Sequence, residues 1–201
     1  MSAEETHPVF DFRKPSNGAD QPVYHLEKTV FFVGFMGAGK TSVARKLARN
    51  AGASAIDMDR YIERRCDMKI SDIFATAGED GFRTIETDVL RELSCGDPCL
   101  VSCGGGVVLS EENRQLLKRG GFVIYLKVTA SEAASRISNW SARPLFSDLE
   151  RAERIIDDRL PLYEEVADIV IDTAGRGTGS LSREVFKRLK DAGVLVQGTS
   201  G

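Results

Sequence analysis

The chain has 201 residues, of which 42% are hydrophobic and 28% are charged, and its formal net charge is −3. This length fits one domain of ordinary size that can bury a sizeable core. The mild acidity argues against broad nucleic-acid binding, which favours a basic surface, and no apolar run approaches the roughly 20 residues that a membrane span needs.

The first 28 residues combine prolines with mixed charges and show no sustained hydrophobic periodicity, so 1–28 is predicted to be a flexible N-terminal extension. This segment has no apolar signal core and is richer in acids than a transit peptide, which leads us to expect a cytoplasmic protein. The cysteines lack the paired spacing of a zinc site and both histidines lie in the extension, so reduced thiols are expected. The cysteines are Cys66, Cys95, Cys99 and Cys103.

After the extension, apolar runs of strand length alternate with helical patterns, which is typical of a parallel sheet covered on both faces. Strands are expected at 29–35, 53–59, 98–103, 122–128 and 167–173. Helices are expected from about Lys40 to Gly52, over 79–93, from Ser110 to Gly120 and near 180–191. This order predicts a three-layer α/β domain at 29–195, followed by a flexible tail at 196–201.

A glycine-rich stretch lies between the first expected strand and the first expected helix. Gly34 is followed after four residues by Gly39-Lys40-Thr41, which is the Walker A pattern. Glycines let backbone N–H groups turn toward phosphate oxygens, and the helix N-terminus adds positive charge. The alternative is a plain glycine-rich turn before a helix, but the strand–loop–helix context favours phosphate binding. The predicted ATP contacts are Gly37, Ala38, Gly39, Lys40, Thr41 and Ser42.

A second group of polar residues lies near the carboxyl ends of the expected strands, where ligands bind in open α/β sheets. The group comprises Asp57, Asp59, Arg83, 102–106, Arg143 and Arg159. No Asn-Lys-x-Asp guanine-reading motif accompanies the phosphate loop, which disfavours a GTPase.

Each member of this group also has a plainer explanation. Asp57 and Asp59 could cap a helix N-terminus, and Arg83 could pair with Glu79 or Glu86 on a helix surface. The triple glycine could be an ordinary strand-to-helix turn, and Arg159 could belong to a solvated run of charges.

Taken in order and spacing, these motifs resemble the shikimate kinases over roughly residues 29–192. The shared stretches are "DMDRYIE", "ISDIFATAGEDGFRTIE", the triple glycine, "RPL" and "PLYEEVAD". The resemblance implies a P-loop fold with a five-stranded parallel sheet in the order 2-3-1-4-5 and a mobile lid at about 139–148. It also implies that ATP phosphorylates the 3-hydroxyl of shikimate, a step toward chorismate and the aromatic amino acids.

The resemblance implies a role for each residue on the acceptor side. Arg83 and Arg159 would hold the shikimate carboxylate, which suits the guanidinium fork. Gly104, Gly105 and Gly106 would approach the ring. Asp59 would bind the attacking hydroxyl, either orienting it or accepting its proton, and the sequence does not separate these two roles.

On the nucleotide side, the resemblance implies that Thr41 and Asp57 hold Mg²⁺, the latter through water. Arg143 would be the lid arginine that balances charge on the transferring phosphate, beside Lys40. Arg136 and Arg176 would flank the adenine. The implied partners are ATP and shikimate, without nucleic acid or membrane, and the implied oligomeric state is a monomer.

Two departures from the family pattern concern the nucleotide side. The stretch between Arg143 and Arg159 is about one helical turn shorter than in many relatives, which affects lid reach, and the loop "DTAGRGTGS" lacks a frequent proline. Two other functions stay open: a related kinase of quinate, gluconate or a nucleoside monophosphate, and a nucleotide-dependent regulatory protein that has lost turnover. An acceptor panel separates them.

Overall fold

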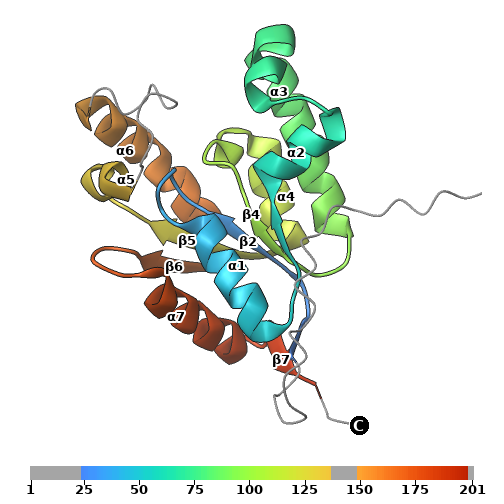
Figure 1. Cartoon of the computed structure of the whole chain (residues 1–201), viewed down its shortest axis with the longest axis vertical. Coiled ribbons are helices and arrows are strands. Elements are labelled where there is room, and N and C mark those ends of the chain that lie inside the picture. The colour runs from blue at the N-terminus through green and yellow to red at the C-terminus, as the bar shows by residue number, and fades with distance from the viewer. Residues whose placement is uncertain (1–23, 137–148, 199–201) are drawn as a thin grey trace, which may run out of the picture.

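The computed structural model describes residues 24–136 and 149–198 (Figure 1). A central sheet of five parallel strands has the spatial order β3-β4-β2-β5-β6. These strands are β2 (Thr29–Val33), β3 (Ala55–Asp57), β4 (Leu100–Ser102), β5 (Gly121–Lys127) and β6 (Ile169–Asp172). Numbered along the chain, their order is 2-3-1-4-5, so the predicted topology is confirmed.

Helices cover both faces of this sheet, which makes the three layers that the sequence predicts (Figure 1). They are α1 (Lys40–Ala51), α2 (Met58–Cys66), α3 (Ile70–Cys95), the 3₁₀ turn η1 (Val107–Leu109), α4 (Glu111–Gly120), α5 (Ala130–Arg136), α6 (Leu149–Val166) and α7 (Thr178–Asp191). None of the helices within 24–136 and 149–198 combines the length and the apolar character that crossing a bilayer requires.

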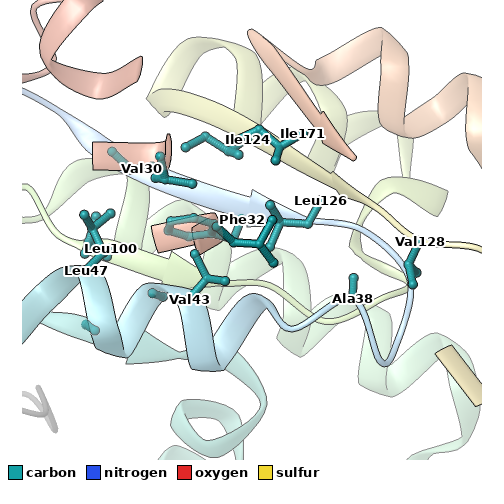
Figure 2. Close-up of a cluster of buried hydrophobic side chains, with 14 of the residues drawn as sticks. Val30, Phe32, Ala38, Val43, Leu47, Leu100, Ile124, Leu126, Val128 and Ile171 are labelled. Carbon is teal, nitrogen blue, oxygen red and sulfur yellow. The ribbon is translucent and has the colours of Figure 1, made fainter. Parts of the chain in front are cut away.

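The sheet separates two hydrophobic cores because successive side chains of a strand point to opposite faces. Val30 and Phe32 of β2 join one core with the buried faces of α1 and α7, and Figure 2 shows the part of it around α1. Phe31 and Val33 join the other core, beneath α2, α3 and α4. Every residue of β2 is therefore buried, as the uninterrupted apolar run indicated.

α6 contributes to both cores. Ala152 and Ile156, in its first half, pack in the core that contains α1. Tyr163 and Val166, in its last turn, pack in the core on the other face of the sheet. The helix therefore packs against both cores, and Arg159 between these two parts contacts the carbonyl of Gly105, beyond the carboxyl end of β4.

Helix ends follow the local sequence signals. α1 ends at Gly52, which adopts φ 67° as the left-handed C-cap. α2 begins after Asp57, whose carboxylate accepts from the backbone N–H of Arg60, and α4 begins after Ser110, whose hydroxyl accepts from the N–H of Asn113. The explanation of Asp57 as a helix N-cap is therefore confirmed, and it does not exclude a further role for this residue.

The helix expected over 79–93 is part of a longer element. α3 starts at Ile70 and bends at Gly78, where φ is 71° and ψ is −175°. Glu79 begins the segment after the bend, so the apolar periodicity located the second segment and missed the first. The strand expected at 53–59 is also shorter, because helix α2 starts at Met58.

Two short strands reach beyond the expected domain limits at 29 and 195. Strand β1 (Tyr24–Leu26) pairs antiparallel with β7 (Leu195–Gln197) in a separate two-stranded sheet. The ring of Tyr24 contacts Phe186 of α7 edge to face, with centroids 5.0 Å apart. Short strands of three residues carry little periodicity, so the pairing had no signal in either segment alone.

Candidate active site

The phosphate loop joins β2 to α1 and closes around the side chain of Lys40. The Nζ atom of Lys40 donates to the carbonyls of Gly34 at 2.7 Å and Phe35 at 3.0 Å. Gly37 has φ +78°, and a Cβ at this position would lie 2.8 Å from the carbonyl oxygen of Ala133 in α5. Only glycine fits there, and the loop therefore turns its backbone inward at the N-terminus of α1.

A set of oxygen atoms lies beside the start of α1. The hydroxyl of Thr41 donates to Oδ2 of Asp57 at 2.9 Å and lies 2.9 Å from the hydroxyl of Ser102. Asp57 and Ser102 are opposite each other in the paired ends of β3 and β4. Hydroxyl and carboxylate oxygens are ligands that Mg²⁺ accepts, so these residues fit that ion. Asp57 thus caps α2 and contributes to this set at once.

Two carboxylates lie against Gly104 on the other side of the triple glycine. A Cβ at Gly104 would be 3.0 Å from Oδ1 of Asp59 and 3.2 Å from Oε1 of Glu86. Glu86 is 1% exposed. Burial raises its pKa; Arg83 opposes this shift and the charge of Asp59 adds to it.

Arg83 lies next to Gly106 and is held by two glutamates. Its Nη1 donates to Oε2 of Glu86 at 2.7 Å and its Nη2 donates to Oε1 of Glu79 at 3.1 Å. A Cβ at Gly106 would lie 2.7 Å from both terminal nitrogens. Burial opposes the charged form of Arg83, but Glu86 and Glu79 outweigh burial and raise its pKa. The predicted ion pairs exist, and they aim the guanidinium at the triple glycine.

Gly105, in the middle of the triple glycine, connects the two halves of the site. A Cβ at this position would lie 3.6 Å from the N atom of Met36 and 3.7 Å from the carbonyl oxygen of Gly34, both in the phosphate loop. From α6, Nη1 of Arg159 and the hydroxyl of Tyr163 donate to the Gly105 carbonyl at 3.3 Å and 2.5 Å. Arg159 therefore contacts the triple glycine and is not simply part of a solvated charge run.

Arg136 and Arg176 both hold the segment that follows β6. The Nη atoms of Arg136 donate to the hydroxyl of Thr173 at 3.0 Å and to its carbonyl at 2.7 Å. Arg176 donates to the carbonyl of Asp172 at 3.2 Å and pairs with Glu184 at 2.6 Å. The structure thus brings both arginines to the loop at which the resemblance places the adenine.

Arg143, the predicted lid arginine, lies outside the described residues, as does the predicted lid at 139–148. Apart from Arg136 and Arg176 at the loop after β6, the remaining predicted residues fall into two connected groups. The phosphate-loop group contains Gly37, Ala38, Gly39, Lys40, Thr41, Ser42 and Asp57. The acceptor group contains Asp59, Arg83, Gly104, Gly105, Gly106 and Arg159.

Three side chains at the site received no functional role from the sequence. The sequence indicates Ser102 only as part of the stretch 102–106, Glu86 only as a surface partner of Arg83, and Tyr163 only as a packing or lid residue. The spacing of Arg83 and Glu86, three residues apart on one helix, was the available signal for Glu86. For Ser102 and Tyr163, whose roles come from contacts with distant segments, no comparable local signal exists.

The cysteines take no part in these contacts. All four thiols are free. Burial raises the pKa of Cys99 to about 11 and also raises that of Cys103, which keeps both thiols protonated. Within the described part of the chain, no three His, Cys, Asp or Glu side chains form a group that could hold a metal ion.

The fold and this site define the class of protein: a P-loop phosphotransferase with a second polar group beside its phosphate loop. Residues 36–190 match the family model described as shikimate kinase. A shikimate kinase of Bordetella avium is 40% identical over 164 residues, covering 80% of this chain and 78% of that protein. The chain belongs to the shikimate kinase family.

Solved structures agree with this assignment. A shikimate kinase from Acinetobacter baumannii, in complex with shikimate, has a TM-score of 0.77 and 36% identity, covering 82% of this chain and 94% of that one. A gluconokinase from Sinorhizobium meliloti has a TM-score of 0.53 at 18% identity, covering 84% of this chain and 94% of that one. The second likeness concerns the fold alone, so it does not favour gluconate as the acceptor.

Proposed function

We propose that this chain transfers the γ-phosphoryl group of ATP to the 3-hydroxyl of shikimate. The products are shikimate 3-phosphate and ADP, and the reaction is a step in the synthesis of chorismate and the aromatic amino acids. The observation that carries the proposal is the junction at Gly105, where the triple glycine contacts both the phosphate loop and Arg159. Phosphoryl transfer depends chiefly on such positioning and on charge neutralisation.

On the nucleotide side, the backbone N–H groups of the loop and the N-terminus of α1 bind the phosphates. Lys40 exchanges its bonds to the carbonyls of Gly34 and Phe35 for phosphate oxygens. Thr41 and Asp57 would hold Mg²⁺, with Ser102 beside them. The ion, when bound, neutralises charge on the phosphates.

On the acceptor side, Arg83 and Arg159 hold the carboxylate of the substrate. A guanidinium has five N–H donors, and Arg83 commits two of them to Glu86 and Glu79, which leaves donors for a ligand. Asp59, next to Gly104, orients the attacking hydroxyl or accepts its proton. Both arginines are fixed by neighbours before the ligand arrives, which lowers the ordering cost of binding.

The remaining assignments rest on the family resemblance. Arg143, in a lid at about 139–148, balances charge on the transferring phosphate and excludes water. Arg136 and Arg176, which hold the loop after β6, flank the adenine. We further propose that the protein acts as a cytoplasmic monomer.

The decisive experiment measures ADP release from Mg·ATP with shikimate, quinate, gluconate or AMP as the acceptor. The same assay is applied to Asp59→Asn and to the control Asp88→Asn, which alters a half-exposed aspartate of α3. We expect release only with shikimate, a kcat lower by about 10²- to 10⁴-fold for Asp59→Asn, and wild-type activity for the control.

Turnover with another acceptor in preference to shikimate would overturn the proposed substrate. The assignment of the phosphate loop as a nucleotide-binding site would not be affected. An acceptor-independent ATPase, or nucleotide binding without any turnover, would favour the regulatory alternative. Full activity in Asp59→Asn would remove Asp59 from the proposed mechanism.

A further inference from the structure

The carbonyl oxygen of Gly105 is the point at which α6 contacts the triple glycine. The hydroxyl of Tyr163 donates to this oxygen at 2.5 Å, and Nη1 of Arg159 donates to it at 3.3 Å. Arg159 and Tyr163 are four residues apart on one helix, so they project from the same face. Arg159 has a place in the proposed mechanism, whereas Tyr163 has none.

The other side of the same glycine touches the phosphate loop. A Cβ at Gly105 would lie 3.7 Å from the carbonyl oxygen of Gly34, and this oxygen accepts from Lys40 at 2.7 Å. Gly105 is thus held between α6 and the residues that bind the phosphates. A shift of its carbonyl would change the distance between the phosphate loop and the acceptor side.

The side chain of Tyr163 is itself held in place. It is fully buried, and its ring stacks on that of Tyr125 in β5, with centroids 5.0 Å apart and an interplanar angle of 19°. Burial raises the pKa of Tyr163 to about 12, although Arg159 opposes the shift. The hydroxyl therefore stays protonated at neutral pH and remains a donor.

A second contact ties α6 to the end of this segment. Nη1 of Arg114 donates to the carbonyl of Val108 at 2.9 Å, and its Nε forms an ion pair with Glu165 of α6 at 2.8 Å. Glu165 is 44% exposed, whereas the Tyr163 contact is inside the core. The inner contact is therefore the one that fixes Gly105.

We propose that Tyr163 is a positioning residue of the kinase: its hydroxyl fixes the Gly105 carbonyl and so sets the triple glycine and Arg159 relative to the phosphate loop. This inference rests on the proposed function. Tyr163 acts through Gly105 and Arg159 and touches neither substrate. Its effect should therefore fall on acceptor alignment, while nucleotide binding, which depends on the loop's own backbone, changes little.

The test removes the hydroxyl alone, with Tyr163→Phe, and compares it with Tyr125→Phe. The control removes a hydroxyl from the stacked neighbour, which makes no hydrogen bond to the described residues through that group. We expect Tyr163→Phe to lower kcat/KM for shikimate by about 10-fold, the effect of losing one well-made hydrogen bond, and to leave KM for ATP within about 2-fold. Tyr125→Phe should match the wild type.

A double-substitution cycle with Arg159→Lys adds a readout that a purely structural role would not move. Because both side chains act on one carbonyl, their effects on kcat/KM for shikimate should be non-additive. If Tyr163→Phe does not fold, 3,5-difluorotyrosine at position 163 keeps the ring and lowers the pKa of the phenol. An alkaline loss of kcat/KM for shikimate, absent from the wild type, is then expected.

Three outcomes would overturn the inference: wild-type kinetics in Tyr163→Phe, parallel losses for ATP and shikimate that follow a fall in melting temperature, or strict additivity with Arg159→Lys. The same assay separates this failure from failure of the proposed function. If the wild type shows no shikimate-dependent turnover, the proposed function and this inference both fall; if the wild type turns over normally and Tyr163→Phe does too, only the inference falls.

Discussion

The phosphate loop is one short stretch of chain, whereas the acceptor side comes from four distant elements. The first is the loop from Gly34 to Thr41, in which Lys40 bonds to the carbonyls of its own loop. The second combines α2, α3, the triple glycine and α6. A local site depends on backbone conformation, while an assembled site depends on the packing of the whole domain, so the two should respond differently to substitution.

The largest effect is expected from a substitution that disrupts nucleotide binding alone. Lys40→Met removes the amine that reaches the phosphates, and kcat/KM for ATP should fall by about 10³-fold because a preorganised cation is lost. Calorimetric titration should still show shikimate binding, since Arg83 and Arg159 are untouched. Lys46→Met, an exposed lysine of α1, is the control. Loss of shikimate binding in Lys40→Met would show that the two sides are not separable.

The second prediction concerns a substitution that disrupts the acceptor side. Arg83→Lys replaces a planar fork by a point charge and leaves the buried carboxylate of Glu86 with a weaker partner. We expect kcat/KM for shikimate to fall by about 100-fold, as for the loss of a charged hydrogen bond, while KM for ATP stays within about 2-fold. Steady-state kinetics with each substrate varied in turn would measure both. Equal losses of kcat/KM for ATP and for shikimate would contradict the division of the site into a nucleotide side and an acceptor side.

The third prediction concerns Glu86→Gln. The variant should raise KM for shikimate by about 10-fold, because the bond that orients Arg83 loses its charge. The folded-state pKa of Glu86 is raised above its ordinary value of 4.5. The stability that this group contributes is therefore fully present below 4.5 and is lost as the pH rises through the raised folded value. Wild type should lose stability relative to Glu86→Gln over that window.

Urea unfolding of both proteins between pH 5 and pH 8 measures this difference. Glu79→Gln, which alters the 65%-exposed partner of Arg83, serves as the control and should show little dependence on pH. A stability difference that moves in favour of the wild type with rising pH would show that Arg83 outweighs burial at Glu86.

The smallest expected effect comes from an arginine on the same helix with a similar number of acidic partners. Arg91 pairs with Asp88 at 2.7 Å and with Glu112 at 2.5 Å, and all three side chains are about half exposed. Exposed pairs contribute little, so Arg91→Ala should leave kcat/KM within about 2-fold of the wild type. A loss comparable to that of Arg83→Lys would show that burial is not what separates the two arginines.

The same contrast explains how much the sequence predicted. The phosphate loop and the five strands were predictable, because a contiguous motif and apolar periodicity encode them, whereas the order of the strands came from the family resemblance. The acceptor residues stood out as a polar group near the expected strand ends, but their individual roles came only from the family resemblance. From the residues alone, Arg83 had two explanations, and the structure shows that the ion pair with Glu86 and the approach to Gly106 coexist.

What the sequence missed depends on contacts between segments that are far apart. Ser102 matters because it faces Asp57 across two strands, and Tyr163 because it reaches Gly105 from α6. The first half of α3 was missed because Gly78 interrupts its periodicity. Nothing local to any of these residues distinguishes them from ordinary core or surface positions.

The pairing of β1 with β7 has a consequence for N-terminally truncated versions of the protein. A truncation at residue 29, the expected start of the domain, would keep β2 but delete Tyr24 to Leu26. That deletion uncovers Leu195 and leaves the backbone of β7 without its neighbour, at the far end of the chain from the cut. An exposed apolar strand edge invites self-association. Aggregation of such a fragment would therefore come from the exposed strand β7 near the C-terminus, even though the truncation removes no catalytic residue.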